Sequence, residues 1–206
     1  APTEIYTLSL HDALPIYACP LAAPGQGKSG GMNVYVRQLA SALGNMGMLI
    51  DIFTREHSDV VNRIETIGPN VRVIHIAAGD TEAHVGELYA HLPAFLKQLN
   101  AFREEEGLEY DVVHSHYWLS SWIGRELSQA MGVPHLVTFH TLGLIKMQSR
   151  AGEVEQPERP VVEAEVMASA DRIIAFSPHE RDAMARLYGA DAAKVSLVPC
   201  GVDLSV

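Results

Sequence analysis

A glycine-rich segment, Ala22 to Gly31, contains the letters of two phosphate-binding motifs. Gly25, Gly27 and Gly30 spell G-x-G-x-x-G, a pattern that in dinucleotide-binding proteins follows a strand and opens a helix. Such a site also needs an acidic residue about 20 positions further on to hold a ribose hydroxyl. Asp51 has that spacing, but it lies inside the apolar run L-I-D-I-F. We therefore do not favour a dinucleotide site.

The same segment also matches a relaxed P-loop. Ala22 to Ser29 read A-x-x-x-x-G-K-S, in which Lys28 would reach nucleotide phosphates and Ser29 would hold magnesium. No second strand ends in an aspartate placed for that magnesium, and Pro20 and Pro24 interrupt the strand-to-loop transition that both motifs need. A P-loop nucleotide-binding protein thus stays an alternative.

Consecutive glycines ahead of a helix have a simpler use. They let the backbone approach an anion, and a helix starting near Asn33 offers unpaired N–H groups in its first turn. The segment is either a phosphate-binding loop or a glycine-rich connector, and its pattern alone leaves both open.

Two histidines, His114 and His116, flank Ser115 in a short apolar run. Alternate residues of a strand share a face, so both rings should lie on the same side. A zinc site would need at least a third ligand and supporting groups around the ligands. We favour structural or acceptor-lining histidines over a metal site.

Composition and charge indicate one soluble domain. The chain has 206 residues, of which 48% are hydrophobic and 19% charged, enough for a single sizeable core. Its 15 basic and 25 acidic residues give a net charge of −10, which disfavours nucleic acid and anionic lipid as partners. Cys19 and Cys200 form no C-x-x-C pair, so we expect a cytoplasmic protein without an integral membrane segment.

Short apolar runs alternate with amphipathic segments, which is typical of βαβ units. The runs predict parallel strands at 49–54, 71–76, 111–115, 135–139, 172–176 and 195–198. Helical spacing predicts helices at 33–43, 87–106, 119–131, 160–169 and 178–188. Gly44 and Gly47 are expected to end the first helix, and the polar stretch 143–159 predicts a mobile loop. The expected fold class is α/β, a Rossmann-like parallel sheet with helices on both faces.

The first sixteen residues need separate treatment. Residues 2–16, P-T-E-I-Y-T-L-S-L-H-D-A-L-P-I, closely resemble a translated sequencing adapter. We interpret residues 1–16 as a non-native segment and leave them out of the functional reasoning. The alternative is a genuine strand, because Tyr6, Leu8 and Leu10 recur at period two. On the first interpretation, the native first strand is missing or replaced.

Five longer motifs resemble one enzyme family. They are residues 20–37 (P-L-A-A-P-G-Q-G-K-S-G-G-M-N-V-Y-V-R), 111–120 (D-V-V-H-S-H-Y-W-L-S), 138–142 (T-F-H-T-L), 170–177 (A-D-R-I-I-A-F-S) and 198–203 (V-P-C-G-V-D). Together they resemble the GT4 glycosyltransferases, particularly the mycothiol-pathway and sucrose-phosphate-synthase-like branches. The resemblance implies a GT-B fold, with the N-terminal acceptor-side domain at 17–197. Residues 198–206 would begin the linker to a missing C-terminal donor-binding domain.

The resemblance also implies a set of site residues at the carboxyl edge of the sheet, where open α/β sheets bind ligands. Gly30 and Gly31 would contact the donor phosphates through their backbone. His140 would touch the transferred sugar, and a neutral imidazole can hydrogen-bond a sugar hydroxyl. We expect it to be a catalytic positioning residue rather than a base. The expected acceptor-binding residues are Met32, Asn33, Tyr117, Thr141, Lys146 and Arg159.

Two departures from the family bear on the acceptor. Mycothiol-type relatives hold the phosphate of an inositol phosphate with a lysine and an arginine, and the matching positions here read Val85 and Pro160. Arg159, one residue away, and Lys146 are the candidate cations for an anionic acceptor. The acceptor is therefore expected to be a hydroxyl compound, such as a sugar or cyclitol, phosphorylated or not.

The chemistry implied by the resemblance is a retaining transfer from a nucleotide-sugar. In front-face attack the leaving phosphate accepts the acceptor's proton, so catalysis depends on positioning and electrostatic stabilisation. No cofactor or catalytic metal is expected. The chain alone, an N-terminal fragment on this interpretation, is expected to be inactive. A non-catalytic sugar-binding module is a further alternative.

Lys28→Ala distinguishes the glycosyltransferase from the P-loop protein. In a P-loop protein, calorimetry should show that nucleotide binding is abolished, because the lysine contacts the phosphates. In a glycosyltransferase the change should weaken binding less than loss of His140 or of the Gly30 and Gly31 pair.

Overall fold

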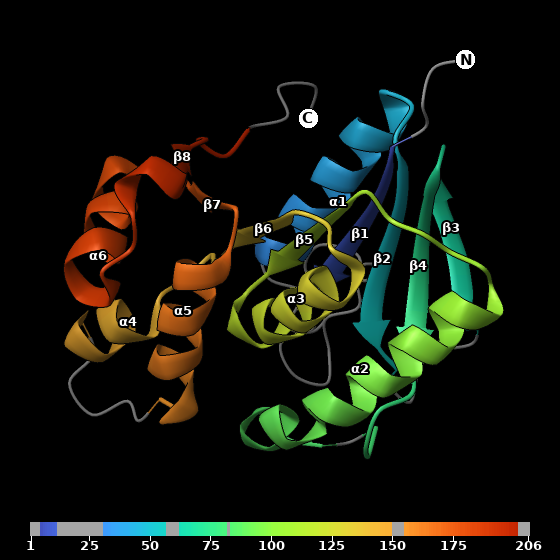
Figure 1. The fold of residues 1–206 in the computed structure, drawn as a ribbon, viewed down its shortest axis with the longest axis horizontal. Coiled ribbons are helices and arrows are strands. Elements are labelled where there is room, and N and C mark those ends of the chain that lie inside the picture. Colours follow the sequence, from blue (N-terminus) through green and yellow to red (C-terminus); the bar gives the residue numbers. More distant parts are fainter. Residues whose placement is uncertain (1–4, 12–30, 57–61, 82, 150–154, 202–206) are drawn as a thin grey trace.

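The computed structural model describes residues 5–11, 31–56, 62–81, 83–149 and 155–201. These residues form a central sheet in the order β3-β4-β2-β1-β5-β6-β7-β8 (Figure 1). Neighbouring strands pair in parallel, except that β3 is antiparallel to β4. The strands are β1 (Tyr6–His11), β2 (Leu49–Arg55), β3 (Ile64–Gly68), β4 (Val71–Ile76), β5 (Val112–His116), β6 (His135–Thr138), β7 (Arg172–Ala175) and β8 (Val195–Leu197).

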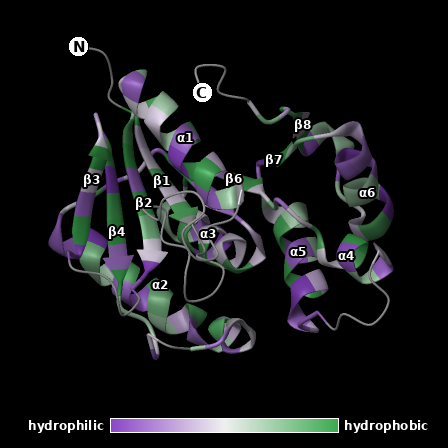
Figure 2. Ribbon diagram, turned by 180° about the vertical axis from the view of Figure 1, so that it is seen from behind, coloured by the Kyte–Doolittle hydropathy of each residue, from purple (hydrophilic) through white to green (hydrophobic). Residues whose placement is uncertain are grey.

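Helices cover both faces of this sheet, which confirms the expected fold class. Helix α1 lies on one face and helices α2 and α3 lie on the other, while α4, α5 and α6 gather at the end formed by β7 and β8 (Figures 1 and 2). No helix in the described ranges is both long enough and apolar enough to cross a bilayer. The helices are α1 (Gly31–Asn45), α2 (Leu88–Glu105), α3 (Trp118–Met131), α4 (Gly143–Ser149), α5 (Glu158–Ser169) and α6 (Pro178–Tyr188), with short 3₁₀ turns at Val85–Glu87 and Ala192–Lys194.

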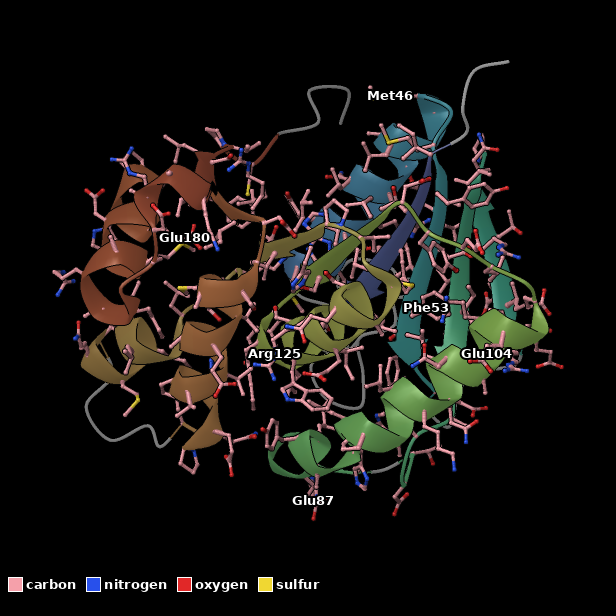
Figure 3. All side chains as sticks on the ribbon, in the orientation of Figure 1. Met46, Phe53, Glu87, Glu104, Arg125 and Glu180 are labelled. Atoms are coloured by element: carbon pink, nitrogen blue, oxygen red, sulfur yellow. The ribbon has the colours of Figure 1, made fainter. Side chains whose placement is uncertain are left out.

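Strand β2 shows why the strands read as continuous apolar runs. Ile50 and Ile52 pack under α1 against Val36 and other fully buried side chains. Phe53, labelled in Figure 3, belongs to the core on the opposite face, where its ring meets Phe102 of α2 edge to face at 5.8 Å. Because successive side chains point to opposite faces and both faces are covered, β2 carries buried apolar side chains on both of its faces. The hydropathy of the strands is drawn in Figure 2.

The chain order of the strands creates a topological switch point at the carboxyl edge. Strand β1 lies between β2 and β5, so the connections after β1 and after β5 start from neighbouring strands and lead to opposite halves of the sheet. Open α/β sheets bind ligands at such a switch point. Helix α1 begins beside it, and the ends of β5 and β6 are the next positions along this edge.

Residues Tyr6–His11 form the central strand β1. Leu8 and Leu10 are fully buried in the core beneath α2 and α3, so the strand interpretation of these residues is confirmed as structure. The interpretation of residues 1–16 as a non-native segment stays a prediction.

All six strands predicted from apolar runs are present, as are the five predicted helices. The loop prediction for 143–159 is wrong where helices form, and residues 150–154 of this stretch lie outside the described residues. Residues Gly143–Ser149 form α4, and α5 begins at Glu158. The first N–H groups of α4 are satisfied by distant side chains: Gly143 donates to Glu163 at 3.0 Å and Leu144 to the Tyr188 hydroxyl at 2.8 Å. Local sequence does not show such long-range capping.

Gly44 was expected to end α1, but the helix continues to Asn45. A Cβ added to Gly44 would lie 2.4 Å from the Pro69 carbonyl oxygen and 2.6 Å from a Val71 methyl group. Gly44 is therefore needed for close packing of α1 on the sheet. Gly47, with φ of 92°, makes the turn after the helix.

Asp51 has a structural role and lies away from the carboxyl edge of the sheet. It accepts hydrogen bonds from the Tyr110 hydroxyl at 2.7 Å and from two nitrogens of Arg72 at 2.7 and 2.6 Å. It sits in the first half of β2 and is 5% exposed. A ribose-binding role for Asp51 is thus excluded by its position and its partners.

Substitutions in this cluster should change stability in a graded way. Tyr110→Phe removes one hydrogen bond and should lower the free energy of unfolding by about 1 kcal/mol. Asp51→Ala leaves Arg72 without its carboxylate and should cost about 2 kcal/mol, less than a fully buried pair because a third of the Arg72 side chain is exposed. Urea unfolding measures both. Wild-type stability in Asp51→Ala would contradict this account.

Candidate active site at the carboxyl edge of the sheet

Four aromatic side chains from separate elements meet at the carboxyl edge. The ring of Tyr35 in α1 lies edge-on to His140 at 5.2 Å, to Phe176 at 5.1 Å and to His116 at 6.0 Å. His140 and Phe176 are 5.4 Å apart. We call Tyr35, His116, His140 and Phe176 the aromatic cluster. It ties the first turns of α1 to the ends of β5, β6 and β7.

Two residues of this edge have backbone conformations that L-amino acids rarely adopt. Tyr117, directly after β5, has φ of 76°, and His140, two residues after β6, has φ of 62°. Such conformations cost about 1–3 kcal/mol each and persist only when the surroundings hold them. Here the Tyr117 N–H donates to the Thr138 carbonyl at 2.9 Å, and the Thr141 N–H donates to the Phe139 carbonyl at 2.7 Å.

The three histidines of this region have different partners. His114 Nε2 lies 2.9 Å from the Thr138 hydroxyl, and burial lowers the pKa of His114 to about 4. The imidazole of His114 therefore carries no charge at neutral pH and is bonded within the sheet. His116 Nδ1 lies 3.1 Å from His140 Nε2. This bond joins a buried histidine to the predicted sugar-contacting one.

Arg159 lies behind the predicted acceptor residues. It is 1% exposed. Nη1 donates to the Tyr117 hydroxyl at 3.0 Å, and Nη2 donates to the carbonyl and hydroxyl oxygens of Thr141 at 2.9 and 3.0 Å. The guanidinium also lies 4.8 Å from the centre of the Tyr117 ring. Arg159 thus holds both acceptor candidates from inside the protein.

Two carboxylates balance this guanidinium. Nε of Arg159 donates to Glu163 at 2.8 Å and Nη1 donates to Glu155 at 2.8 Å. Glu163 is completely buried and also accepts from the Gly143 N–H and the Tyr188 hydroxyl. Burial raises the pKa of Glu163, and Arg159 and the other donors offset part of that rise. Glu155 additionally pairs with Lys146.

The structure brings most of the predicted site residues to one edge. Gly31 is the first residue of α1, where an added Cβ would meet open space. Met32 and Asn33 follow in the first turn of α1, and Asn33 is buried.

His140 belongs to the aromatic cluster, while Tyr117 and Thr141 meet at Arg159. Lys146 lies on α4 with 38% of its side chain exposed. Gly30, the G-x-G-x-x-G pattern and the P-loop pattern lie outside the described residues.

Sequence reasoning missed the residues that hold this edge together. Tyr35 and Phe176 fall inside the family motifs but carry no obvious chemistry. Glu163 could have been found, because Arg159 and Glu163 are four apart on a helix and such pairs face each other. Tyr188 joins them from 25 residues away, and no local pattern announces that contact.

Curated relatives are similar to this sequence. The D-inositol 3-phosphate glycosyltransferase of Actinosynnema mirum is 41% identical over 198 residues, covering 93% of this chain and 47% of the relative. The enzyme of the same description from Acidothermus cellulolyticus is 40% identical over 197 residues, covering 94% and 44%. The chain therefore spans about half the length of the curated relatives it matches.

Solved structures show the same fold. Sucrose-phosphate synthase from Thermosynechococcus elongatus superposes with a TM-score of 0.87 at 31% identity, covering 98% of this chain and 49% of the synthase. The catalytic domain of starch synthase IV from Arabidopsis thaliana superposes with a TM-score of 0.66 at 12% identity, covering 98% and 53%, and supports the fold alone. Residues 29–206 match the family described as Glycosyltransferase Family 4. The chain belongs to this glycosyltransferase family and has a Rossmann-like α/β fold that matches GT-B glycosyltransferases.

Proposed function

We propose that this chain forms the acceptor-side wall of a retaining glycosyltransferase that moves a sugar from a nucleotide-sugar to a hydroxyl of a sugar or cyclitol. The observation that carries the proposal is the convergence of the α1 start, Tyr117, His140 and Thr141 on one edge of the sheet. The proposed enzyme continues this chain with a donor-binding domain, and the two would face each other across the cleft.

The start of α1 supports a role in holding the donor phosphates. The helix has 15 residues, and its first N–H groups and its dipole both favour an anion at this end. Gly31 leaves open space at its Cα, so a phosphate can approach the backbone closely. We assign the donor diphosphate to the backbone of Gly30 and Gly31.

His140 supports positioning of the transferred sugar. Its ring is half-buried, is held by Tyr35 and Phe176, and has one nitrogen bonded to His116. A ring held in this way has a fixed orientation at this edge of the sheet. In the proposed retaining reaction the leaving diphosphate takes the acceptor's proton, so His140 contributes by orienting the sugar, without acting as a base.

Tyr117 and Thr141 support recognition of the acceptor. Arg159 donates to both hydroxyl oxygens and thereby orients both groups. The curated relatives are named for D-inositol 3-phosphate, which supports a cyclitol. Because Lys146 and Arg159 are already paired with Glu155 and Glu163, a phosphate on the acceptor would be held mainly by hydroxyl and backbone donors of this wall.

A fusion of this chain to the C-terminal half of the Actinosynnema mirum relative tests the proposal. The fusion should release nucleoside diphosphate from a nucleotide-sugar only when an acceptor such as inositol or inositol 3-phosphate is present. His140→Ala should lower kcat/KM by about 100-fold, the effect of losing one group that orients the reacting sugar. His179→Ala, which changes an exposed histidine on α6, is the matched control and should have no effect.

Two outcomes would overturn the proposal. One is an inactive fusion under conditions in which the intact relative is active. The other is unchanged activity in His140→Ala.

A further inference from the structure

One carboxylate bridges the two cations that lie among the predicted acceptor residues. Glu155, shortly before α5, uses its two oxygens for different partners: Oε1 pairs with Lys146 Nζ, and Oε2 accepts from Arg159 Nη1 at 2.8 Å. The Glu155 side chain is 10% exposed, whereas 38% of the Lys146 side chain is exposed. Helices α4 and α5, which carry the two cations, lie together at one end of the molecule (Figure 1). Glu155 thus connects both candidate cations for an anionic acceptor.

The guanidinium of Arg159 brings this carboxylate close to the predicted acceptor hydroxyls. Nη1, which bonds Glu155, also donates to the Tyr117 hydroxyl at 3.0 Å. The neighbouring nitrogen, Nη2, donates to the Thr141 hydroxyl at 3.0 Å, and Thr141 is exposed at the carboxyl edge of the sheet. A ligand group that reaches either hydroxyl is therefore only one guanidinium away from the Glu155 carboxylate.

The carboxyl group of Glu155 is ionised at neutral pH. Burial by itself would raise the pKa of Glu155, but the hydrogen bonds from Lys146 and Arg159 outweigh burial and hold the pKa below its usual range. The second carboxylate at Arg159 is that of Glu163, which accepts from Nε at 2.8 Å. Among these described side chains two acids face two bases, so the group offers little net positive charge to an incoming anion.

Stability gives little reason for the bridge. The partly exposed pair of Lys146 and Glu155 contributes little to folding, and Arg159 is already held from the inside by Glu163, Tyr117 and Thr141. A unit charge beside a ligand site has a larger effect on binding, because charges interact more strongly near a protein surface than in bulk water. Glu155 is therefore expected to act mainly on the charge of what binds here.

We propose that Glu155 is a specificity-determining residue, whose carboxylate weakens the hold of Lys146 and Arg159 on an acceptor phosphate and so shifts the preference towards the unphosphorylated sugar or cyclitol. The inference rests on the proposed function, which assigns the acceptor to this part of the edge. A phosphate on the acceptor brings between one and two negative charges close to the carboxylate, and like charges repel. A neutral hydroxyl compound meets no such repulsion.

Phosphate titration of the ¹⁵N-labelled chain, followed by amide NMR at low salt to limit screening, tests the inference. The amide shifts of Thr141 and Gly143 report binding beside Arg159, while those of Met32 and Asn33 report binding at the start of α1. Glu155→Gln keeps the size of the side chain and removes its charge, so it should bind phosphate about tenfold more tightly beside Arg159. The response at the start of α1 should be the same as in the wild type.

Two further variants identify the cause. Lys146→Met removes a cation and should therefore weaken phosphate binding, the opposite of the effect of Glu155→Gln. Glu158→Gln removes the same charge as Glu155→Gln from an exposed residue three positions further on, and it should bind phosphate like the wild type. The amide spectrum of β6 and β7 shows whether each variant is folded.

In an active fusion the same substitution should change specificity. Glu155→Gln should raise kcat/KM for inositol 3-phosphate relative to kcat/KM for inositol by about tenfold and leave the donor KM unchanged. A purely structural role for Glu155 predicts instead that both acceptors lose activity alike.

The inference is overturned if Glu155→Gln binds phosphate beside Arg159 no more tightly than the wild type, if Lys146→Met strengthens that binding, or if Glu158→Gln behaves like Glu155→Gln. The titration needs no donor and no turnover. An inactive fusion would therefore count against the proposed function and leave this test intact.

Discussion

The buried pair of Arg159 and Glu163 is the interaction on which the candidate site depends. Each residue is at most 1% exposed, and the pair lies at 2.8 Å. Arg159 reaches Tyr117 after β5 and Thr141 after β6, while Glu163 holds the first N–H of α4 and the hydroxyl of Tyr188 in α6. One ion pair in α5 thus connects two strand ends and two helices. Removing Arg159 would leave the Glu163 carboxylate buried without its charged partner, which is strongly destabilising.

This connection matters because the edge it supports is strained. Tyr117 and His140 both have positive φ values, and such conformations need surroundings that leave no alternative. Arg159 provides them for Tyr117, and Tyr35, His116 and Phe176 provide them for His140. The side chains are therefore in place before any substrate arrives. A transfer reaction that relies on positioning benefits from such an arrangement.

The sequence predicted the parts of the fold that obey local rules. Strands such as β2 and β4 were found because they are buried on both faces, and α1 was found from its apolar spacing. Strand β3 was missed because it is a short, partly exposed edge strand whose pairing with β4 shifts register between Thr66 and Gly68. Helix α4 was missed because its start is held by Glu163, 20 residues further along the chain.

The candidate site, like the fold, could be predicted only in part from the sequence. His140, Tyr117 and Thr141 came from family motifs, and the structure brings all three to the same edge. Arg159 was identified as a cation near the acceptor, but its burial and its hydrogen bonds to Tyr117 and Thr141 are tertiary facts. The roles of Glu163, Tyr188 and Tyr35 likewise arise only when α1, α5 and α6 come together at the strand ends.

Amide hydrogen exchange in Arg159→Lys tests the central claim most directly. Lysine keeps the charge but cannot reach Tyr117, Thr141 and Glu163 together. The account predicts that the amides of Tyr117, Thr141 and Gly143 exchange at least about tenfold faster than in the wild type, while those of Ile52 and Val73 in the opposite half of the sheet are unchanged. Equal protection at the strand ends, or a uniform loss throughout the sheet, would contradict it.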